Sequence, residues 1–395
     1  MFIVHCQVRA YKIIISGGGT GGHLFPALSI ANELKNRFPE TDILFVGAEN
    51  RMEMERVPTA GYRIIGLPVT GFNRKNLLKN IKVITRLIKS LRIAKKIIRD
   101  FMPDIVIGVG GYASGPTLWM ASSLHIPVLI QEQNSYAGLT NKLLGKRAAK
   151  ICVAYKGMDK YFPKDRIVLT GNPVRKELEL LSERQGAFHA EINKLAINYF
   201  NLENDKPVLL ILGGSLGART INDSILKGLN TLIDKGVQVI WQTGRMFNNC
   251  ESDELKNGAC KGVWRADFIT RMDYAYTVAD LVVSRAGAGT LSELCLLKKA
   301  AILIPSPNVA EDHQTKNART LSDNNAAVLI ADREAEEQLV PTAIELLKNK
   351  ERFRTLSENI ALFAQHNSAK RIVDEVFNIM KKVSSLGCQN EVFNK

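Results

Sequence analysis

A chain of 395 residues, 46% of them hydrophobic, is long enough for two cores, so we expect two globular domains. The first ten residues lack a signal-peptide pattern and no eighteen apolar residues run uninterrupted, which predicts a cytosolic protein without a membrane span. A formal charge of +14 favours anionic partners: nucleic acid, an anionic membrane surface or phosphorylated ligands.

A glycine-rich stretch follows the first predicted strand, residues 13–15, and precedes a helical pattern over residues 26–38. Its sequence is Ser16-Gly17-Gly18-Gly19-Thr20-Gly21-Gly22-His23. Glycines allow a ligand to approach the backbone, so this loop is a candidate site for an anionic or sugar-like group at a helix N-terminus. It matches neither the dinucleotide fingerprint nor the P-loop, and a tight first turn of an ordinary α/β domain is an equal alternative.

The strand pattern continues through the first half of the chain and predicts a parallel sheet. Its strands are predicted over residues 43–47, 63–67, 104–109, 126–131, 150–155 and 166–170. A second glycine loop, residues 110–116, follows one of them, and the polar cluster Glu132-Gln133-Asn134 follows another. Both are candidate site segments, because the carboxyl ends of parallel strands are where such sheets bind ligands.

Residues 74–99 carry ten basic residues and no acidic one. Apolar residues recur among them at helical spacing, which predicts an amphipathic basic helix over residues 77–99. Its apolar side either meets a membrane or packs on the sheet. Nucleic-acid binding fits poorly, because no aromatic stacking platform accompanies the basic residues.

The strand-loop-helix pattern restarts in the second half with a third glycine loop, residues 213–219, after a strand over residues 207–212. Further strands are predicted over residues 237–242, 280–284, 300–304 and 326–330, and a final helical pattern runs over residues 341–382. We therefore predict an N-terminal domain (1–173), a connecting helix and linker (174–206), a C-terminal domain (207–365), and a C-terminal helix that packs back on the N-terminal domain, with a frayed tail (366–395).

Six motifs, in order within residues 11–370, resemble the MurG family of peripheral glycosyltransferases. They comprise residues 18–23, 110–116, 132–134, 171–175 (Gly-Asn-Pro-Val-Arg), 213–219 and 285–293 (Arg-Ala-Gly-Ala-Gly-Thr-Leu-Ser-Glu). The resemblance implies a GT-B architecture, in which two Rossmann-like, doubly wound parallel-sheet domains of the α/β class face each other across a cleft.

The resemblance also implies an inverting transferase. It would move N-acetylglucosamine from UDP-N-acetylglucosamine (UDP-GlcNAc) to the 4-hydroxyl of the MurNAc of undecaprenyl-pyrophosphoryl-MurNAc-pentapeptide (lipid I), giving lipid II for peptidoglycan. The implied location is peripheral, on the anionic cytoplasmic face of the inner membrane, with cell-wall synthesis and division proteins as candidate partners. Another GT-B enzyme of UDP-sugars, a glycolipid synthase or a UDP-GlcNAc epimerase, is the alternative.

The departing UDP needs stabilisation of two phosphate charges, and the chain has no Asp-x-Asp pair to hold a metal. We therefore expect backbone amides at the glycine loops to serve, with no metal and no cofactor. The six cysteines form no C-x-x-C pair and predict free thiols rather than disulfides or a zinc site.

The resemblance assigns most of the donor site. Glu293 would accept the ribose hydroxyls, Gln314 would hold the sugar, and Ile269 with Met272 would line the uracil; a solvated glutamate and simple core residues are the alternatives. For Arg175 the alternative is a linker salt bridge. The predicted donor-binding set is Thr20, Gly21, Gly22, Asn134, Arg175, Ser215, Ile269, Arg285, Ala288, Gly289, Thr290, Leu291, Ser292, Glu293 and Gln314.

His23 is the first candidate for the general base, because a helix N-terminus favours neutral imidazole, which can take a proton from the attacking hydroxyl. A helix cap is its alternative role, and Glu132 is the rival base. Asn134 would orient the acceptor. The residues predicted to meet acceptor or membrane are Tyr112, Ser114, Ile81, Ile84, Arg86 and Ile88.

Overall fold

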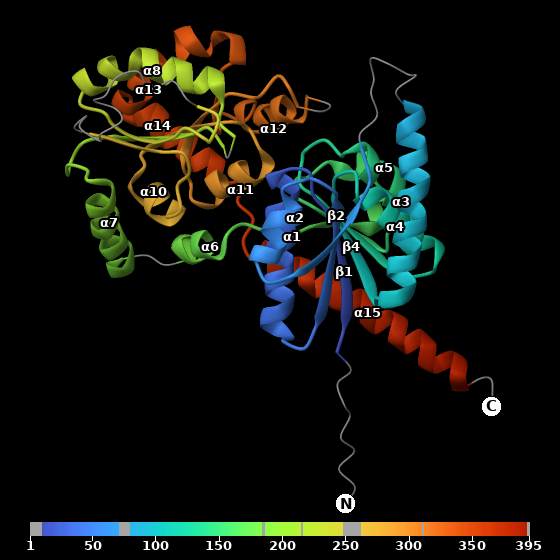
Figure 1. Ribbon diagram of the computed structural model, residues 1–395. Coiled ribbons are helices and arrows are strands. Elements are labelled where there is room, and N and C mark those ends of the chain that lie inside the picture. Colours follow the sequence, from blue (N-terminus) through green and yellow to red (C-terminus); the bar gives the residue numbers. More distant parts are fainter. Residues whose placement is uncertain are drawn as a thin grey trace, which may run out of the picture. The chain divides into compact units, whose positions relative to one another are not determined.

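The structure is a computed structural model that describes residues 10–70, 80–183, 186–214, 216–247, 262–309 and 312–392. The chain divides into two compact units, each built on a parallel sheet (Figure 1). Unit 1 comprises Met1–Pro173 and Asn367–Lys395, and unit 2 comprises Val174–His366.

The seven-stranded sheet of unit 1 has the order β3-β2-β1-β4-β5-β6-β7. Its strands are β1 (Lys12–Gly17), β2 (Asp42–Ala48), β3 (Arg63–Leu67), β4 (Ile105–Gly110), β5 (Val128–Glu132), β6 (Lys150–Val153) and β7 (Ile167–Leu169). The order reverses between β1 and β4, which makes their carboxyl ends the topological switch point where such sheets bind ligands.

Helices cover both faces of this sheet. They are α1 (Gly21–Arg37), α2 (Glu53–Thr59), α3 (Asn80–Phe101), α4 (Ser114–Ser123), α5 (Leu139–Gly145) and α15 (Ser368–Val392), with 3₁₀ turns Met158–Lys160 and Lys164–Arg166. Successive side chains of a strand point to opposite faces of the sheet, so β1 contributes to two parts of the core. Ile13 and Ile15 pack with residues of α1 and α15, whereas Ile14 packs with residues of α3 and α4. A strand buried on both faces therefore appears as an unbroken apolar run.

The helical pattern predicted over residues 341–382 falls on three helices, α13 (Ala335–Lys348), α14 (Lys350–Ala361) and α15, rather than one. Asn349 causes the first break, because its side chain accepts from the amide of Arg352 and caps α14. Only α15 lies in unit 1, alongside α1 (Figure 1), where Arg37 forms an ion pair with Asp374 at 2.5 Å.

The six-stranded sheet of unit 2 has the order β10-β9-β8-β11-β12-β13. Its strands are β8 (Val208–Leu212), β9 (Gln238–Gln242), β10 (Val263–Ala266), β11 (Leu281–Ser284), β12 (Ala300–Leu303) and β13 (Val328–Leu329). The order reverses between β8 and β11, which repeats the switch point of unit 1. The edge strand β10 was absent from the sequence prediction, because its four half-buried residues, Val-Trp-Arg-Ala, make no apolar run.

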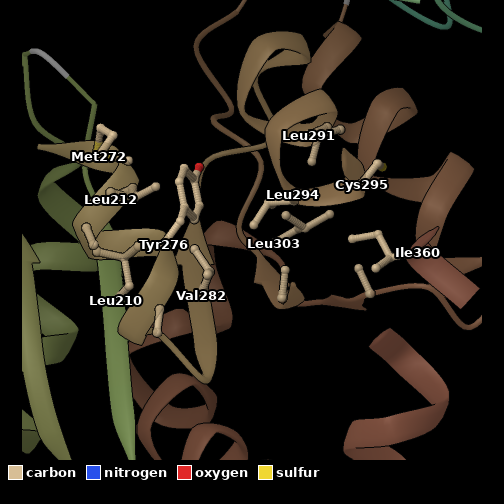
Figure 2. Close-up of a cluster of buried hydrophobic side chains, with 14 of the residues drawn as sticks. Leu210, Leu212, Met272, Tyr276, Val282, Leu291, Leu294, Cys295, Leu303 and Ile360 are labelled. Carbon is tan, nitrogen blue, oxygen red and sulfur yellow. The ribbon is translucent and has the colours of Figure 1, made fainter. Parts of the chain in front are cut away.

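The other helices of unit 2 are α6 (Lys176–Glu183), α7 (Ala187–Phe200), α8 (Arg219–Asp234), α10 (Met272–Val278), α11 (Ala288–Leu296) and α12 (His313–Ser322), with a 3₁₀ turn at Asp332–Glu334. The segment predicted as a connecting helix and linker contributes to this unit's core. Leu178 of α6 and Phe200 of α7 are buried in the same cluster as Tyr276, part of which Figure 2 shows.

Candidate functional site

In unit 1 the two glycine loops meet at the switch point. The amide of Gly18, after β1, donates to the carbonyl of Gly110, at the end of β4, over 3.3 Å. Gly111 has a φ of +89°, and a Cβ there would lie 2.4 Å from Gly18 O. This backbone contact therefore requires glycine at position 111.

The first loop is shorter than predicted, because α1 begins at Gly21 and not at Pro26. Thr20 is the N-cap residue, so Gly21, Gly22 and His23 form the first turn. Because glycine is unfavourable inside a helix, the helix was predicted to begin only after these glycines. In the first turn their amides need no partner within the helix, and they point outward with the positive end of the helix dipole.

His23 is held by its Nδ1 atom, which lies 3.1 Å from Gly18 O and 3.1 Å from Thr20 Oγ1. A carbonyl oxygen can only accept a hydrogen bond, so the contact with Gly18 requires the proton of a neutral imidazole to be on Nδ1. The other ring nitrogen, Nε2, then carries the lone pair. The local backbone thus favours the tautomer in which Nε2 is the basic atom.

Glu132 lies at the end of β5 and is 1% exposed. Its Oε1 accepts from the amide and side chain of Asn134, at 3.1 and 3.2 Å, and its Oε2 accepts from Gly138 N and Asn141 Nδ2, at 3.0 and 2.9 Å. The carboxylate therefore joins the start of α5 to Asn134. Four donors already occupy the lone pairs that a general base would use.

Ser114, which the sequence placed at the acceptor site, is fully buried. Its hydroxyl lies within hydrogen-bond distance of Ser16 O (2.7 Å) and Gly110 O (3.0 Å), so it stabilises the junction of β1 and β4. The side chain is not accessible to an acceptor. Tyr112, in the same loop, is 53% exposed.

In unit 2 the turn after β11 leads into α11 at the second switch point. Gly287 is the N-cap residue, and the first amides of the helix, those of Ala288, Gly289 and Thr290, have no acceptor within the helix. Such amides and the helix dipole favour an anion. Leu291 differs from these three: its side chain is fully buried and its amide donates to Gly287 O, so it belongs to the core.

Glu293 lies one turn further along α11, with a side chain only 12% exposed. Its Oε2 accepts from the hydroxyl of Tyr276 at 3.0 Å, and its Oε1 is 3.6 Å from Nε of Arg175. Burial raises the pKa of Glu293, and the Arg175 charge and the Tyr276 hydrogen bond oppose that shift. Burial also raises the pKa of Tyr276 well above its usual value.

Tyr276 was absent from the predicted site. It is fully buried in the cluster of Figure 2, and its hydroxyl donates to Glu293. An apolar pattern identifies such a tyrosine as core, and the sequence contains no signal that pairs it with Glu293.

Four further predicted donor residues make contacts within unit 2. Nη1 of Arg285 forms an ion pair with Asp332 at 2.5 Å and donates to the carbonyls of Ile304 and Pro305, at 3.1 and 3.2 Å. Oε1 of Gln314 accepts from Ser306 N at 2.8 Å, and the amide of Ile269 donates to Oε1 of Gln242 at 3.0 Å. Ser292 lies on α11, and its hydroxyl donates to Ala288 O.

The apolar residues of α3 form two separate sides. Val83, Ala94 and Ile97 are buried within unit 1. Ile84 and Ile88 are instead 49% and 45% exposed, with Arg86 exposed between them. Trp119, on the neighbouring helix α4, is also 42% exposed. The side chain of Ile81, like Ser215 and residues 77–79, lies outside the described part of the structure.

A groove of about 1020 Å³ lies between β3 and α3 and contains none of the predicted site residues. Leu44, Tyr62, Arg63, Ile65, Arg92 and Lys96 are among its lining residues. Within the described ranges, no three His, Cys, Asp or Glu side chains are grouped to hold a metal ion, and no helix is both long and apolar enough to cross a bilayer.

Comparison with known proteins extends along most of the chain. Residues 13–153 match the glycosyltransferase family 28 N-terminal domain, and residues 208–376 match the family 28 C-terminal domain. A UDP-N-acetylglucosamine--N-acetylmuramyl-(pentapeptide) pyrophosphoryl-undecaprenol N-acetylglucosamine transferase of Parabacteroides distasonis is 61% identical over 376 residues, which cover 95% of this chain and 100% of that protein. The Porphyromonas gingivalis protein of the same name is 57% identical over 371 residues, covering 94% and 96%.

Solved structures show the same fold. The crystal structure of Acinetobacter baumannii MurG matches with a TM-score of 0.72 and 27% identity, over 93% of this chain and 99% of that one. A UDP-N-acetylglucosamine 2-epimerase matches with a TM-score of 0.59 and 14% identity, over 93% and 95%. At that identity the second likeness concerns the fold alone.

Proposed function

The chain belongs to glycosyltransferase family 28, and from this premise we infer that it transfers N-acetylglucosamine from UDP-GlcNAc to lipid I, giving lipid II. The observation that carries this function is 61% identity, across the whole length of a relative, with a transferase named for this donor and acceptor. The architecture is that of the GT-B class, with two parallel-sheet units.

We propose that unit 2 binds the donor. The N-terminus of α11 would stabilise the diphosphate through Ala288, Gly289 and Thr290, since its amides and dipole suit a departing dianion. Glu293 would accept the ribose hydroxyls, because its carboxylate is fixed by Tyr276 and Arg175.

The other predicted donor residues would have different roles. The carbonyl of Ile269 would meet the uracil, since its amide is already bonded to Gln242. Gln314 would hold the sugar hydroxyls. Arg285 would act on the turn after β11 rather than on phosphate, because Asp332 already neutralises its guanidinium. Thr20, Gly21 and Gly22 would contact the donor sugar from unit 1, and Ser215 stays a predicted contact.

We propose His23 as the general base. Nε2 would take the proton of the acceptor 4-hydroxyl as that oxygen bonds to the anomeric carbon, the bond from this carbon to UDP breaks, and its configuration inverts. The Nδ1 contact with Gly18 O supports this direction of proton transfer. Glu132 would not be the base, because four donors already occupy its carboxylate. It would instead hold Asn134, which would orient the acceptor beside Tyr112.

We further propose that the enzyme meets the anionic cytoplasmic face of the membrane through the outer side of α3. Ile84 and Ile88 are exposed there beside Arg86, and Trp119 of α4 adds an exposed aromatic ring. Aliphatic residues that enter the headgroup layer with flanking cations are typical of peripheral binding. Cell-wall synthesis and division proteins stay predicted partners.

The test of the proposed function is acceptor-dependent release of UDP. Purified enzyme should release UDP from UDP-GlcNAc with a lipid I analogue, and neither diacylglycerol nor water should replace that analogue. Conversion of UDP-GlcNAc to its 2-epimer without acceptor, or equal turnover with diacylglycerol, would support the alternative UDP-sugar enzymes instead.

A further inference from the structure

One peptide group lies between a buried carboxylate and His23. The amide of Gly19 donates to Oε2 of Glu53 over 2.9 Å, and the carbonyl of Gly18, in the same peptide group, faces Nδ1 of His23 at 3.1 Å. A trans peptide directs its N–H and C=O to opposite sides. Glu53 and His23 therefore contact the same peptide from its two sides.

Glu53 is fixed independently of the loop. It opens α2, is fully buried, and accepts from the amide of Ala48, at the end of β2, through its Oε1 at 3.0 Å. The loop is shaped around this carboxylate, because Gly18 has a φ of +143° and a Cβ there would lie 2.2 Å from Oε1. The carboxylate thus ties the first glycine loop to the neighbouring strand.

We propose that Glu53 is a positioning residue for the transfer reaction and that it acts on His23 through the Gly18–Gly19 peptide. An ionised carboxylate that accepts the Gly19 N–H polarises the peptide, which makes Gly18 O a stronger acceptor for the Nδ1 proton. The proton is thereby kept on Nδ1, and the lone pair is kept on Nε2. The inference rests on the proposed role of His23 as base.

The variant Glu53→Gln tests this arrangement with little change in shape. A glutamine oxygen can accept from one of the two backbone amides, but its NH₂ group then faces the other, so one hydrogen bond and the charge are lost. Glu55→Gln is the matched control, because Glu55 lies on the same helix, carries the same charge and is exposed.

The main readout is the tautomer of His23, from ¹⁵N chemical shifts of histidine-labelled protein, with His23→Gln to assign the signal among six histidines. We expect Nδ1–H in the native protein and in Glu55→Gln, and a mixture with Nε2–H in Glu53→Gln. We also expect kcat on lipid I to fall about ten- to a hundredfold in Glu53→Gln, the scale on which hydrogen-bond partners of metal-bound side chains affect activity. UDP binding should change less than twofold.

An unchanged tautomer and kcat in folded Glu53→Gln would overturn the proposal. If that variant does not fold, the native protein decides: an Nε2–H tautomer of His23 there overturns the proposal, whereas Nδ1–H with a downfield, protected Gly19 amide proton supports it. Failure of the native enzyme to use lipid I would instead count against the proposed function, since the tautomer is measured without substrate.

Discussion

The Nδ1 atom of His23 faces a carbonyl oxygen, and this contact decides which ring nitrogen can take a proton. At the scale of single residues, the candidate chemistry depends on such fixed contacts. Glu132 and Glu293 also differ in their contacts. Four hydrogen-bond donors surround the carboxylate of Glu132, whereas one hydroxyl and one guanidinium contact that of Glu293.

The variant His23→Ala should lower kcat by about two to four orders of magnitude, the range that a general base contributes. UDP affinity should stay nearly unchanged, because the proposed UDP contacts lie in unit 2. Steady-state kinetics and calorimetric titration with UDP measure the two effects. A small loss of kcat together with a lower melting temperature would show that His23 only caps α1.

The variant Glu293→Gln should raise the KM for the donor roughly ten- to a hundredfold, since charge-assisted hydrogen bonds contribute about 1.5–3 kcal/mol. It should also weaken discrimination against a 2′-deoxyuridine donor. Both follow from a carboxylate that accepts ribose hydroxyls. Donor kinetics equal to those of the native enzyme would remove Glu293 from the site.

The same variant should not lower the melting temperature at neutral pH. Burial raises the pKa of Glu293, so folding favours the protonated side chain. The stability that this gives is present below the pKa of the unfolded state and is lost as the pH rises through the pKa of the folded state. A neutral glutamine avoids that loss. Thermal unfolding at acidic and neutral pH should therefore show the native protein losing more stability than Glu293→Gln as the pH rises.

The variant Tyr276→Phe removes the hydroxyl that donates to Glu293 and leaves a buried acceptor short of one partner. The expected cost is about 1–3 kcal/mol of folding stability, with a higher KM for the donor. Tyr199→Phe, at a tyrosine 45% exposed, is the matched control. Chemical denaturation and donor kinetics check both; equal behaviour of the two variants would show that the hydroxyl does not position Glu293.

At the scale of elements, α3 has a buried and an exposed apolar side. The buried side packs within unit 1, and the exposed side would meet the membrane, although an amphipathic sequence pattern predicts either role equally. Replacing Ile84 and Ile88 by serine, and Arg86 and Lys89 by glutamate, changes only exposed residues. We expect lost binding to anionic vesicles, where each cation contributes roughly 1 kcal/mol, and slow turnover of long-chain lipid I. A short-chain acceptor should still be used well.

The control for this variant is Ile97→Ser, on the buried side of α3, which should lower the melting temperature and leave vesicle binding intact. Vesicle co-sedimentation and thermal unfolding distinguish the two variants. Equal losses on long-chain and short-chain acceptors, together with a lower melting temperature of the outer-side variant, would contradict the membrane role.

Sequence patterns predicted the elements best where an unbroken apolar run meets a glycine loop, as at β1 and β8. They failed where a local preference gave way to tertiary context. Gly21 and Gly22 begin a helix because its first turn needs no partners for their amides, and β10 forms because β9 offers an edge. Asn349 ended a helix inside a pattern that continued beyond it.

At the scale of the whole molecule, the repeated loops predicted a parallel sheet in each unit, and the structure places a glycine loop beside each switch point. Contacts that hold the loops were beyond prediction, because they join distant residues. Gly19 and Glu53 are 34 positions apart, Tyr276 and Glu293 are 17 apart, and Arg285 and Asp332 are 47 apart. A motif indicates which residues gather at a strand end, but not which partner fixes each one.

The central claim is inverting transfer of N-acetylglucosamine to lipid I, and the linkage of the product tests it most directly. The native enzyme would be incubated with UDP-GlcNAc and a lipid I analogue, and the product examined by mass spectrometry and NMR. We predict one added N-acetylhexosamine, joined to the 4-hydroxyl of MurNAc with the anomeric configuration opposite to that of the donor. An unmodified acceptor, a retained configuration or linkage at another hydroxyl would contradict the account.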